Sequence, residues 1–278
     1  MTDEPPRSRS ARKAAEEALV RVVHHYGATP EFVLLGGLVP EILCDKSGAE
    51  HAGTTDIDVQ VDLEIAAGTT NVKRLERALG NAEFESSDGR VWRWETEAEG
   101  MKAAVKFELL TDLDNEPADA TVIFDECDAL GALNLRGTGF ATRDFVPRPL
   151  RAKVGGILYD VEVNVTGLAG FLLAKTAAAY SRSKEKDWYD IAFVLLHNNE
   201  GGPREAAART KFLFLQDLVG QTRTALDELL ANFTNEVDQG PSAYASQFLI
   251  DHPGEDGRQL RADAVLAVTT YHSELFAL

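Results

Sequence analysis

Apolar and polar residues recur along the chain with two different periods, and residues 1–166 show both of them. Apolar residues at helical spacing predict helices, whereas a period of two or a short apolar run predicts strands. The predicted helices of this part are 10–26, 38–44 and 71–80. The predicted strands are 32–35, 55–63, an antiparallel pair at 89–96 and 102–110, and three strand-like runs within 140–165. Residues 111–139 are acidic and rich in turn residues, and their pattern gives no assignment.

From residue 167 onward, every periodic segment has helical spacing. The predicted helices are 168–181, 187–198, 203–232 (as one helix or as a broken one), 242–250 and 258–275. Mixed elements followed by a run of helices are typical of an α+β architecture. We therefore predict an α/β domain at 1–166, with a mixed sheet, flanking helices and a flexible tail at 1–10, and an all-helical domain at 167–278.

The composition is that of a soluble globular protein, with 44% hydrophobic and 26% charged residues among 278. The net charge of −17 argues against broad, non-specific binding of nucleic acid, which needs a basic surface. Cys44 and Cys127 lack the spacing of metal ligands, which fits a reducing compartment. The sequence shows neither a secretory h-region nor an apolar run of membrane-spanning length. We expect a cytoplasmic protein with no membrane partner.

Two carboxylates share one face of the predicted strand at 55–63. Asp56 and Asp58 alternate with the apolar residues Ile57 and Val59, so the two acids point the same way. Like charges at this spacing repel and resist desolvation, so the pair predicts either solvent or a bound cation beside the strand. Carboxylate oxygens are the hard ligands that Mg²⁺ prefers, and Mn²⁺ is an alternative.

A glycine pair, Gly36 and Gly37, ends the apolar run at 32–35 just before a predicted helix. Glycine lets the backbone approach a phosphate closely, and the helix start presents free N–H groups. Either signal alone is weak, because most glycine pairs are turns and most Asp-x-Asp strands face solvent. Together, in this order, they predict a site for a nucleotide that carries Mg²⁺.

The stretch "LLGGLVPEILC…TTDIDVQV" resembles the nucleotidyltransferase signature of the DNA polymerase β-like superfamily. The resemblance rests on the glycine pair, the Asp-x-Asp strand and the Thr-Thr pair before the first Asp. It implies that Gly36, Gly37 and Thr55 contact the nucleotide, with Gly37 against its phosphates. It also implies that Asp56 and Asp58 bind Mg²⁺.

Proteins of that superfamily usually add a third acid from a neighbouring strand. Glu108 is the candidate for this third metal ligand, and Glu162 is the alternative. Each of them is equally well explained as a surface residue of its strand. The superfamily has Asp at this position, so the number of bound metal ions stays open.

A lysine and two aspartates stand out in the predicted helical domain. Lys175 lies on an apolar helix face with Phe171 and Leu172, where a lysine either snorkels or pairs with an anion. Asp187 fits the ordinary role of a first-turn acid at the start of the next helix. Asp190 lies deeper in that helix among apolar residues, so helix capping does not explain it.

The segment from Leu168 to Leu196 resembles the AbiEii/AbiGii-type nucleotidyltransferase toxins, also called MenT-type toxins. The resemblance implies that the helical domain completes the active site. Lys175 would neutralise the triphosphate, Asp190 would orient Lys175 or act in the site, and Arg182 would meet nucleotide or RNA phosphate unless it belongs to a solvated loop. It also implies a toxin of a toxin–antitoxin or phage-defence system, with a cognate antitoxin as partner.

The function that we expect is transfer of a nucleoside monophosphate from an NTP to an acceptor hydroxyl, with tRNA as the acceptor that the resemblance implies. One alternative keeps the fold and uses a protein side chain or an aminoglycoside-like small molecule as acceptor. An acidic surface suits a cationic antibiotic better than it suits tRNA. Another is a non-catalytic module that binds a nucleotide or a protein partner. Trp92 and Trp94 share a predicted sheet face and fit either base stacking or core packing.

Overall fold

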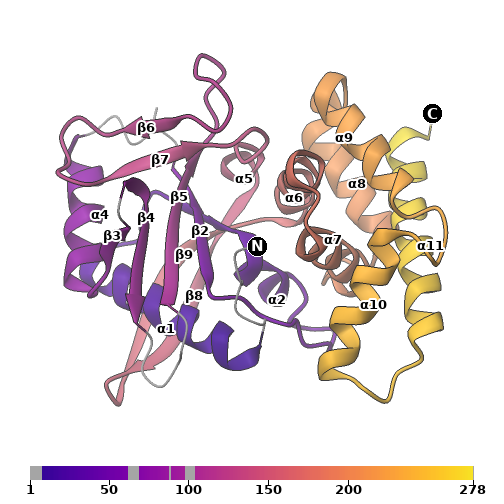
Figure 1. Cartoon of the computed structure of the whole chain (residues 1–278), viewed down its shortest axis with the longest axis horizontal. Helices are drawn as coiled ribbons and strands as arrows, with labels where there is room; N and C mark the ends of the chain where they lie inside the picture. Colours follow the sequence, from indigo (N-terminus) through magenta and orange to yellow (C-terminus); the bar gives the residue numbers. More distant parts are fainter. Residues whose placement is uncertain (1–7, 62–68, 88, 98–103, 278) are drawn as a thin grey trace. The chain divides into compact units, whose positions relative to one another are not determined.

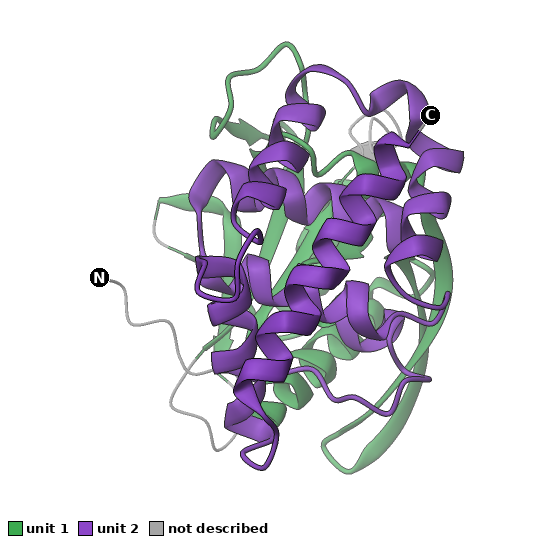
Figure 2. Cartoon of the chain, turned by 90° about the vertical axis from the view of Figure 1, so that its right-hand side faces the viewer, with its two compact units in different colours: residues 1–39, 53–166 green, residues 40–52, 167–278 purple. Residues whose placement is uncertain are grey.

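The computed structural model describes residues 8–61, 69–87, 89–97 and 104–277, and Figure 1 shows their helices and strands. The chain forms two compact units, drawn in green and purple in Figure 2. Unit 1 contains Met1–Val39 and Gly53–Thr166, and unit 2 contains Pro40–Ala52 and Gly167–Leu278. The single boundary predicted at 166/167 did not anticipate that residues 40–52 group with the helical unit.

Unit 1 is built on a mixed sheet with the strand order β3-β4-β5-β2-β1-β9-β8. Its strands are β1 (Val33–Leu35), β2 (Asp56–Gln60), β3 (Glu85–Ser87), β4 (Arg90–Glu97), β5 (Ala104–Thr111), β6 (Thr121–Ile123), β7 (Gly131–Asn134), β8 (Phe145–Val154) and β9 (Ile157–Thr166). In the middle of the sheet, β2 runs antiparallel to β1 and parallel to β5. The predicted α+β class with a mixed sheet is confirmed.

The helical elements of the first part of the chain are α1 (Arg9–Tyr26), η1 (Gly36–Leu38), α2 (Val39–Leu43), α4 (Thr69–Asn81) and α5 (Phe140–Arg143). Helix α1 is capped at its N-terminus by Ser8, whose Oγ accepts a hydrogen bond from the backbone N–H of Ala11 at 3.2 Å. It packs against α4 and lies along β8 and β9. Residues 1–7 of the predicted tail lie outside the described residues.

The alternation read from the sequence separates a covered and a polar face of the sheet. Ile57 and Val59 of β2 and Phe107 of β5 are fully buried on the covered face. Trp94 pairs with Phe107 and is 7% exposed, so it belongs to the core and not to a base-stacking surface. The acids of β2 are on the opposite face.

The sequence pattern failed between residues 111 and 165. Two short strands, β6 and β7, lie in the stretch that had no assignment, and β7 pairs with β5 in parallel. The three strand-like runs predicted within 140–165 are instead the short helix α5 and one long hairpin, β8–β9. Exposed positions on most of β8 removed the alternation that would have marked it as one strand.

Unit 2 is helical throughout its described C-terminal part. Its elements are α6 (Leu168–Arg182), α7 (Glu185–His197), α8 (Pro203–Phe214), η2 (Leu215–Asp217), α9 (Gly220–Ala231), α10 (Gln239–Asp251) and α11 (Gly257–Phe276). The helix predicted at 203–232 is thus broken, at a point where Gly220 has a positive φ of 54°. Helix α7 packs against α6, α10 and α11. None of the described helices is both long enough and apolar enough to cross a membrane.

Residues 40–52 are fixed to α7 and to the turn that follows it. The backbone N–H of Lys46 donates to Asn199 Oδ1 at 3.0 Å, and Asn199 N donates to the carbonyl of Leu43 at 2.9 Å. At the other end of the segment, Ala52 N donates to the hydroxyl of Tyr189 at 3.1 Å. These hydrogen bonds explain why the segment belongs to unit 2.

Candidate functional site

The predicted glycine pair lies directly against the predicted carboxylate strand in unit 1. The antiparallel register places Leu35 opposite Asp58, so the turn begins beside that acid. Gly36 has φ +80°, and a Cβ there would overlap the Asp58 carboxylate. A Cβ on Gly37 would lie 2.9 Å from Cβ of Thr54. Both positions therefore require glycine for a close approach, and Gly36 also requires it for its backbone conformation.

The residues before β2 fix where the strand starts. Thr54 Oγ1 accepts a hydrogen bond from Asp56 N at 3.0 Å, and the carbonyl of Thr55 accepts one from Lys106 N at 3.1 Å. The Thr55 residue is 6% exposed. Its predicted contact with a nucleotide stays a prediction, and its observed role is to join β2 to β5.

Asp56 and Asp58 share a half-buried face of β2 with charged neighbours on β5. The parallel register places Lys106 beside Asp56 and Glu108 beside Asp58. Lys106 Nζ lies 3.7 Å from Asp56 Oδ1. Arg93 Nη2, from β4, lies 2.6 Å from Glu108 Oε1. The face therefore carries charges of both signs, with two acids from adjacent strands, Asp58 and Glu108, side by side.

The strand register separates the two candidates for the third acid. Glu108 is the cross-strand neighbour of Asp58. Glu162 of β9 precedes Asn164, the partner of Val33 at the start of β1, and accepts a hydrogen bond from Thr29 Oγ1 at 2.9 Å. Glu162 thus lies at the end of β1 that is remote from the glycine turn, which leaves Glu108 as the acid beside Asp58.

The donor set fits a magnesium ion that is bound together with a substrate. In the part of the chain that the structure describes, no group of three or more His, Cys, Asp or Glu side chains is placed to hold a metal ion. Protein sites for Mg²⁺ commonly use one or two carboxylates and leave the other positions to water and substrate phosphates. Asp56 and Asp58 supply such a pair, whereas Glu108 is engaged with Arg93.

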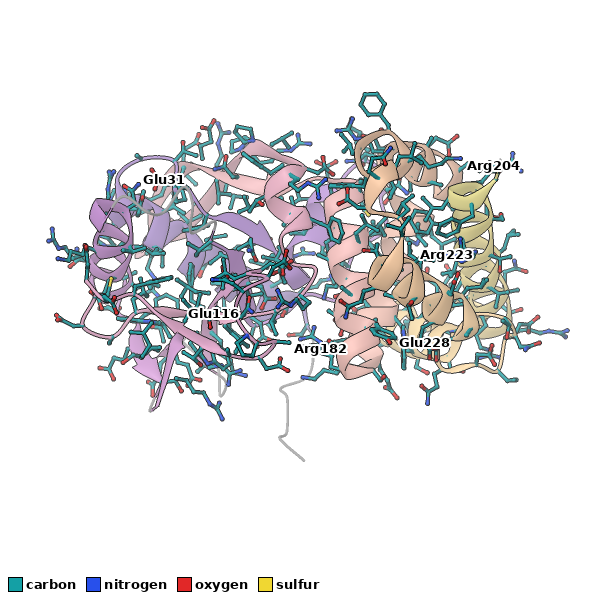
Figure 3. The ribbon with its side chains drawn as sticks, turned by 90° about the horizontal axis from the view of Figure 1, so that it is seen from above. Glu31, Glu116, Arg182, Arg204, Arg223 and Glu228 are labelled. Carbon is teal, nitrogen blue, oxygen red and sulfur yellow. The ribbon has the colours of Figure 1, made fainter. Side chains whose placement is uncertain are left out.

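A second charged cluster is buried in unit 2, where α6 and α7 meet. Lys175 Nζ lies 3.1 Å from Asp187 Oδ1 and 2.7 Å from Asp190 Oδ2. Arg182, the last residue of α6 and labelled in Figure 3, donates to both oxygens of Asp187 at 2.7 and 2.8 Å. Asp187 and Asp190 are fully buried, and the side chain of Lys175 is 8% exposed. The two cations and two carboxylates balance in formal charge.

The cations of this cluster control the ionisation of Asp187. Burial acts to raise the pKa of the Asp187 carboxyl, but the charge of Lys175 and the hydrogen bonds and charge of Arg182 outweigh it. The pKa of Asp187 is therefore below its ordinary value. Asp187 is indeed a first-turn acid of α7, as predicted, but it is also the centre of a buried ion-pair network.

His51 belongs to this cluster and was missed in the sequence. It is fully buried, and its Nε2 lies 2.9 Å from Asp190 Oδ1. Its position in a polar loop gave no periodic signal, and its partner is far away along the chain. A buried histidine could have been suspected only from the apolar surroundings of Asp190, which needed a partner for its second oxygen.

The predicted site residues therefore fall into two sets. Unit 1 brings together Gly36, Gly37, Thr55, Asp56, Asp58 and Glu108, and unit 2 brings together Lys175, Arg182 and Asp190. Comparison of the chain with models of protein families and with curated proteins gave no match. The chemistry of the two clusters is thus the basis for assigning a function.

Proposed function

We propose that the protein is a magnesium-dependent nucleotidyltransferase, which moves a nucleoside monophosphate from an NTP to an acceptor hydroxyl and releases pyrophosphate. The observation that carries the proposal is the contact between Gly36 and Asp58, which leaves no room for a Cβ. A glycine turn held against a pair of carboxylates offers backbone groups for phosphates beside ligands for their metal ion. This arrangement, with an acid on the neighbouring strand, supports a nucleotidyltransferase-like fold for unit 1.

In the proposed reaction, the oxygen of the acceptor hydroxyl forms a bond to the α-phosphorus of the NTP as the bond to the β-phosphate oxygen breaks, so that pyrophosphate leaves and the hydroxyl proton passes to water. Asp56 and Asp58 would hold Mg²⁺, which would offset the negative charge of the phosphates. Gly37 lets the backbone meet those phosphates. The contribution of the chain is positioning and electrostatic stabilisation, which suffice for phosphoryl-type transfers.

The proposal gives the lysine of unit 2 the role of neutralising triphosphate charge. Lys175 Nζ has three N–H donors, and the two carboxylate contacts that it makes among the described residues leave one donor for a phosphate oxygen. Asp187 and Asp190 fix the ammonium group, so its position costs little entropy when a nucleotide binds. Arg182 neutralises Asp187 in the described contacts, and its predicted phosphate contact stays a proposal.

Labelling tests the proposal directly. Wild type, Asp56→Asn and the control Asp125→Asn, which changes an exposed acid of the same unit, are incubated with Mg²⁺, total tRNA and each NTP radiolabelled at the α-phosphate. We expect label in tRNA with wild type and the control, and none with Asp56→Asn. Label on the protein itself or on an added aminoglycoside would change the acceptor and keep the enzyme class. Absence of label from every acceptor tried would overturn the proposal.

The resemblance to nucleotidyltransferase toxins extends the proposal to the cell. Expression of the wild-type protein is then expected to arrest bacterial growth, and expression of Asp56→Asn is not. A partner protein that restores growth with the wild type would be the proposed antitoxin. Normal growth at equal protein levels would contradict the toxin role and leave the transferase activity to be judged by labelling.

A further inference from the structure

The buried histidine of unit 2 makes a directional contact with an acid that holds Lys175. His51 Nε2 lies 2.9 Å from Asp190 Oδ1, and both side chains have no exposed surface. Since an ionised carboxylate only accepts hydrogen bonds, the histidine nitrogen is the donor. The other oxygen of Asp190 lies 2.7 Å from Lys175 Nζ, so the same carboxylate contacts both the histidine and the lysine. The His51 hydrogen bond therefore orients the carboxylate, and charge attracts the lysine to it.

His51 is itself held from several sides. Its backbone N–H donates to Glu41 Oε2 at 3.0 Å. Its ring lies 5.0 Å from the rings of both Tyr189 and Phe193 of α7, measured between centroids. The next residue, Ala52, donates its N–H to the Tyr189 hydroxyl. The backbone contacts hold the loop and the ring contacts restrict the side chain, which is what a residue needs in order to fix a second side chain.

We propose that His51 is a positioning residue that fixes Asp190 and, through it, the ammonium group of Lys175. This inference rests on the proposed function, because the value of a fixed Lys175 lies in meeting the charge that develops on a nucleotide phosphate. Loss of the His51 hydrogen bond removes one of the contacts that orient the Asp190 carboxylate, so the carboxylate can shift, and the ammonium group then follows it or moves toward Asp187. Displacement of about 1 Å in a charged group can cost up to about 100-fold in rate.

Three substitutions distinguish a positioning role of His51 from a role in packing alone. His51→Phe keeps an aromatic ring and removes the donor, whereas His51→Gln keeps an N–H donor near the position of Nε2. His197→Gln is the matched control, since His197 is another histidine packed on Phe193, at 4.8 Å between rings, and hydrogen-bonded to the Tyr244 hydroxyl at 3.1 Å. His197 has no contact with Lys175 among the described interactions.

Two measurements are made on each full-length protein. The first is kcat and KM for the NTP in the transfer assay. The second is the rate at which an acylating reagent modifies Lys175, followed by peptide mass spectrometry, which does not depend on any activity. In His51→Phe we expect kcat to fall by about 10–100-fold with KM changed by less than about two-fold, and Lys175 to be modified faster. His51→Gln is expected to restore both values, and His197→Gln to match the wild type.

Wild-type kcat and wild-type labelling of Lys175 in His51→Phe would overturn the inference. So would an equal loss in His51→Phe, His51→Gln and His197→Gln, because a packing role predicts that result. If His51→Phe does not fold, His51→Asn, whose amide is too short to reach the Nε2 position, takes its place with the same expectations. If the wild type transfers no nucleotide, the proposed function fails, and the modification rate of Lys175 still decides whether His51 fixes it.

Discussion

Replacement of Gly36 by alanine is expected to lower the free energy of unfolding for two reasons, an unfavourable backbone conformation and a steric clash with Asp58. Gly36 has φ +80°, and an alanine in this left-handed region costs about 1–2 kcal/mol. The added methyl group would also overlap the Asp58 carboxylate, and overpacking of this kind costs about 1–3 kcal/mol more. We therefore expect Gly36→Ala to lower the free energy of unfolding by about 2–5 kcal/mol. Because Asp58 has to move, we also expect nucleotide transfer to be lost.

Gly156→Ala is the matched control for this experiment. Gly156 has φ +84°, and a Cβ there would have no described atom within 4 Å. It should lose only the conformational part, about 1–2 kcal/mol, and keep full transfer activity. Urea unfolding of the two variants and of the wild type measures the difference. Equal losses of stability would refute the crowding of Asp58, and wild-type transfer by Gly36→Ala would refute the placement of this carboxylate in the reaction.

Glu108→Gln is expected to raise the Mg²⁺ concentration that half-saturates transfer, whereas Glu162→Gln is not, because only Glu108 is the cross-strand neighbour of a β2 aspartate. A Mg²⁺ titration of the transfer rate would show equal shifts if this reasoning were wrong. Lys175→Met removes the cation shared by two buried carboxylates and is expected to lower the free energy of unfolding by about 3–5 kcal/mol. Urea unfolding measures this loss, and a change of only a few tenths of a kcal/mol, as for a surface pair, would contradict it. Burial lowers the pKa of His197 from 6.5 to about 4, so below pH 6.5 the unfolded chain binds more protons than the native one. Stability is then lost as the pH falls from about 6.5 to 4, by roughly 3 kcal/mol in all, and His197→Gln should remove this part of the pH dependence in urea unfolding.

The central strands and the C-terminal helices were predictable because the spacing of apolar residues within each element is enough to indicate its type. In β2, every second residue is apolar, and the antiparallel pairing of β4 with β5 follows from their alternation and closeness in the chain. The strands β6 and β7 have three and four residues, which is too short for a period to be read. The loop between β5 and β6 is held by Asn134 of β7, a fully buried side chain that donates to the carbonyls of Leu113, Glu116 and Pro117. The local sequence pattern does not predict these hydrogen bonds between residues that are far apart in the chain.

The same distinction applies to the site. Asp56 and Asp58 were found because the strand period places them on one face, and the glycine pair because a turn needs it. Lys175 was found because a lysine on an apolar helix face demands an explanation. His51 was not found, since its importance depends on a partner 139 residues away in the sequence. Sequence periodicity locates a residue on its own element, but only the fold tells which other element faces it.

Charge balance distinguishes the two clusters and gives each of them a different part in the proposed chemistry. The polar face of the unit 1 sheet carries more acids than bases, since Asp56, Asp58 and Glu108 are accompanied by Lys106 and Arg93. Half-buried carboxylates that outnumber the nearby cations repel one another, and a cation from outside the chain reduces this repulsion. The unit 2 cluster is neutral within itself, so it has no need of a metal ion, and its cost of burial is met by internal pairs. In the proposed reaction, the metal ion would therefore be held by the sheet of unit 1, and the contribution of unit 2 would be a lysine whose charge is already balanced by Asp187 and Asp190.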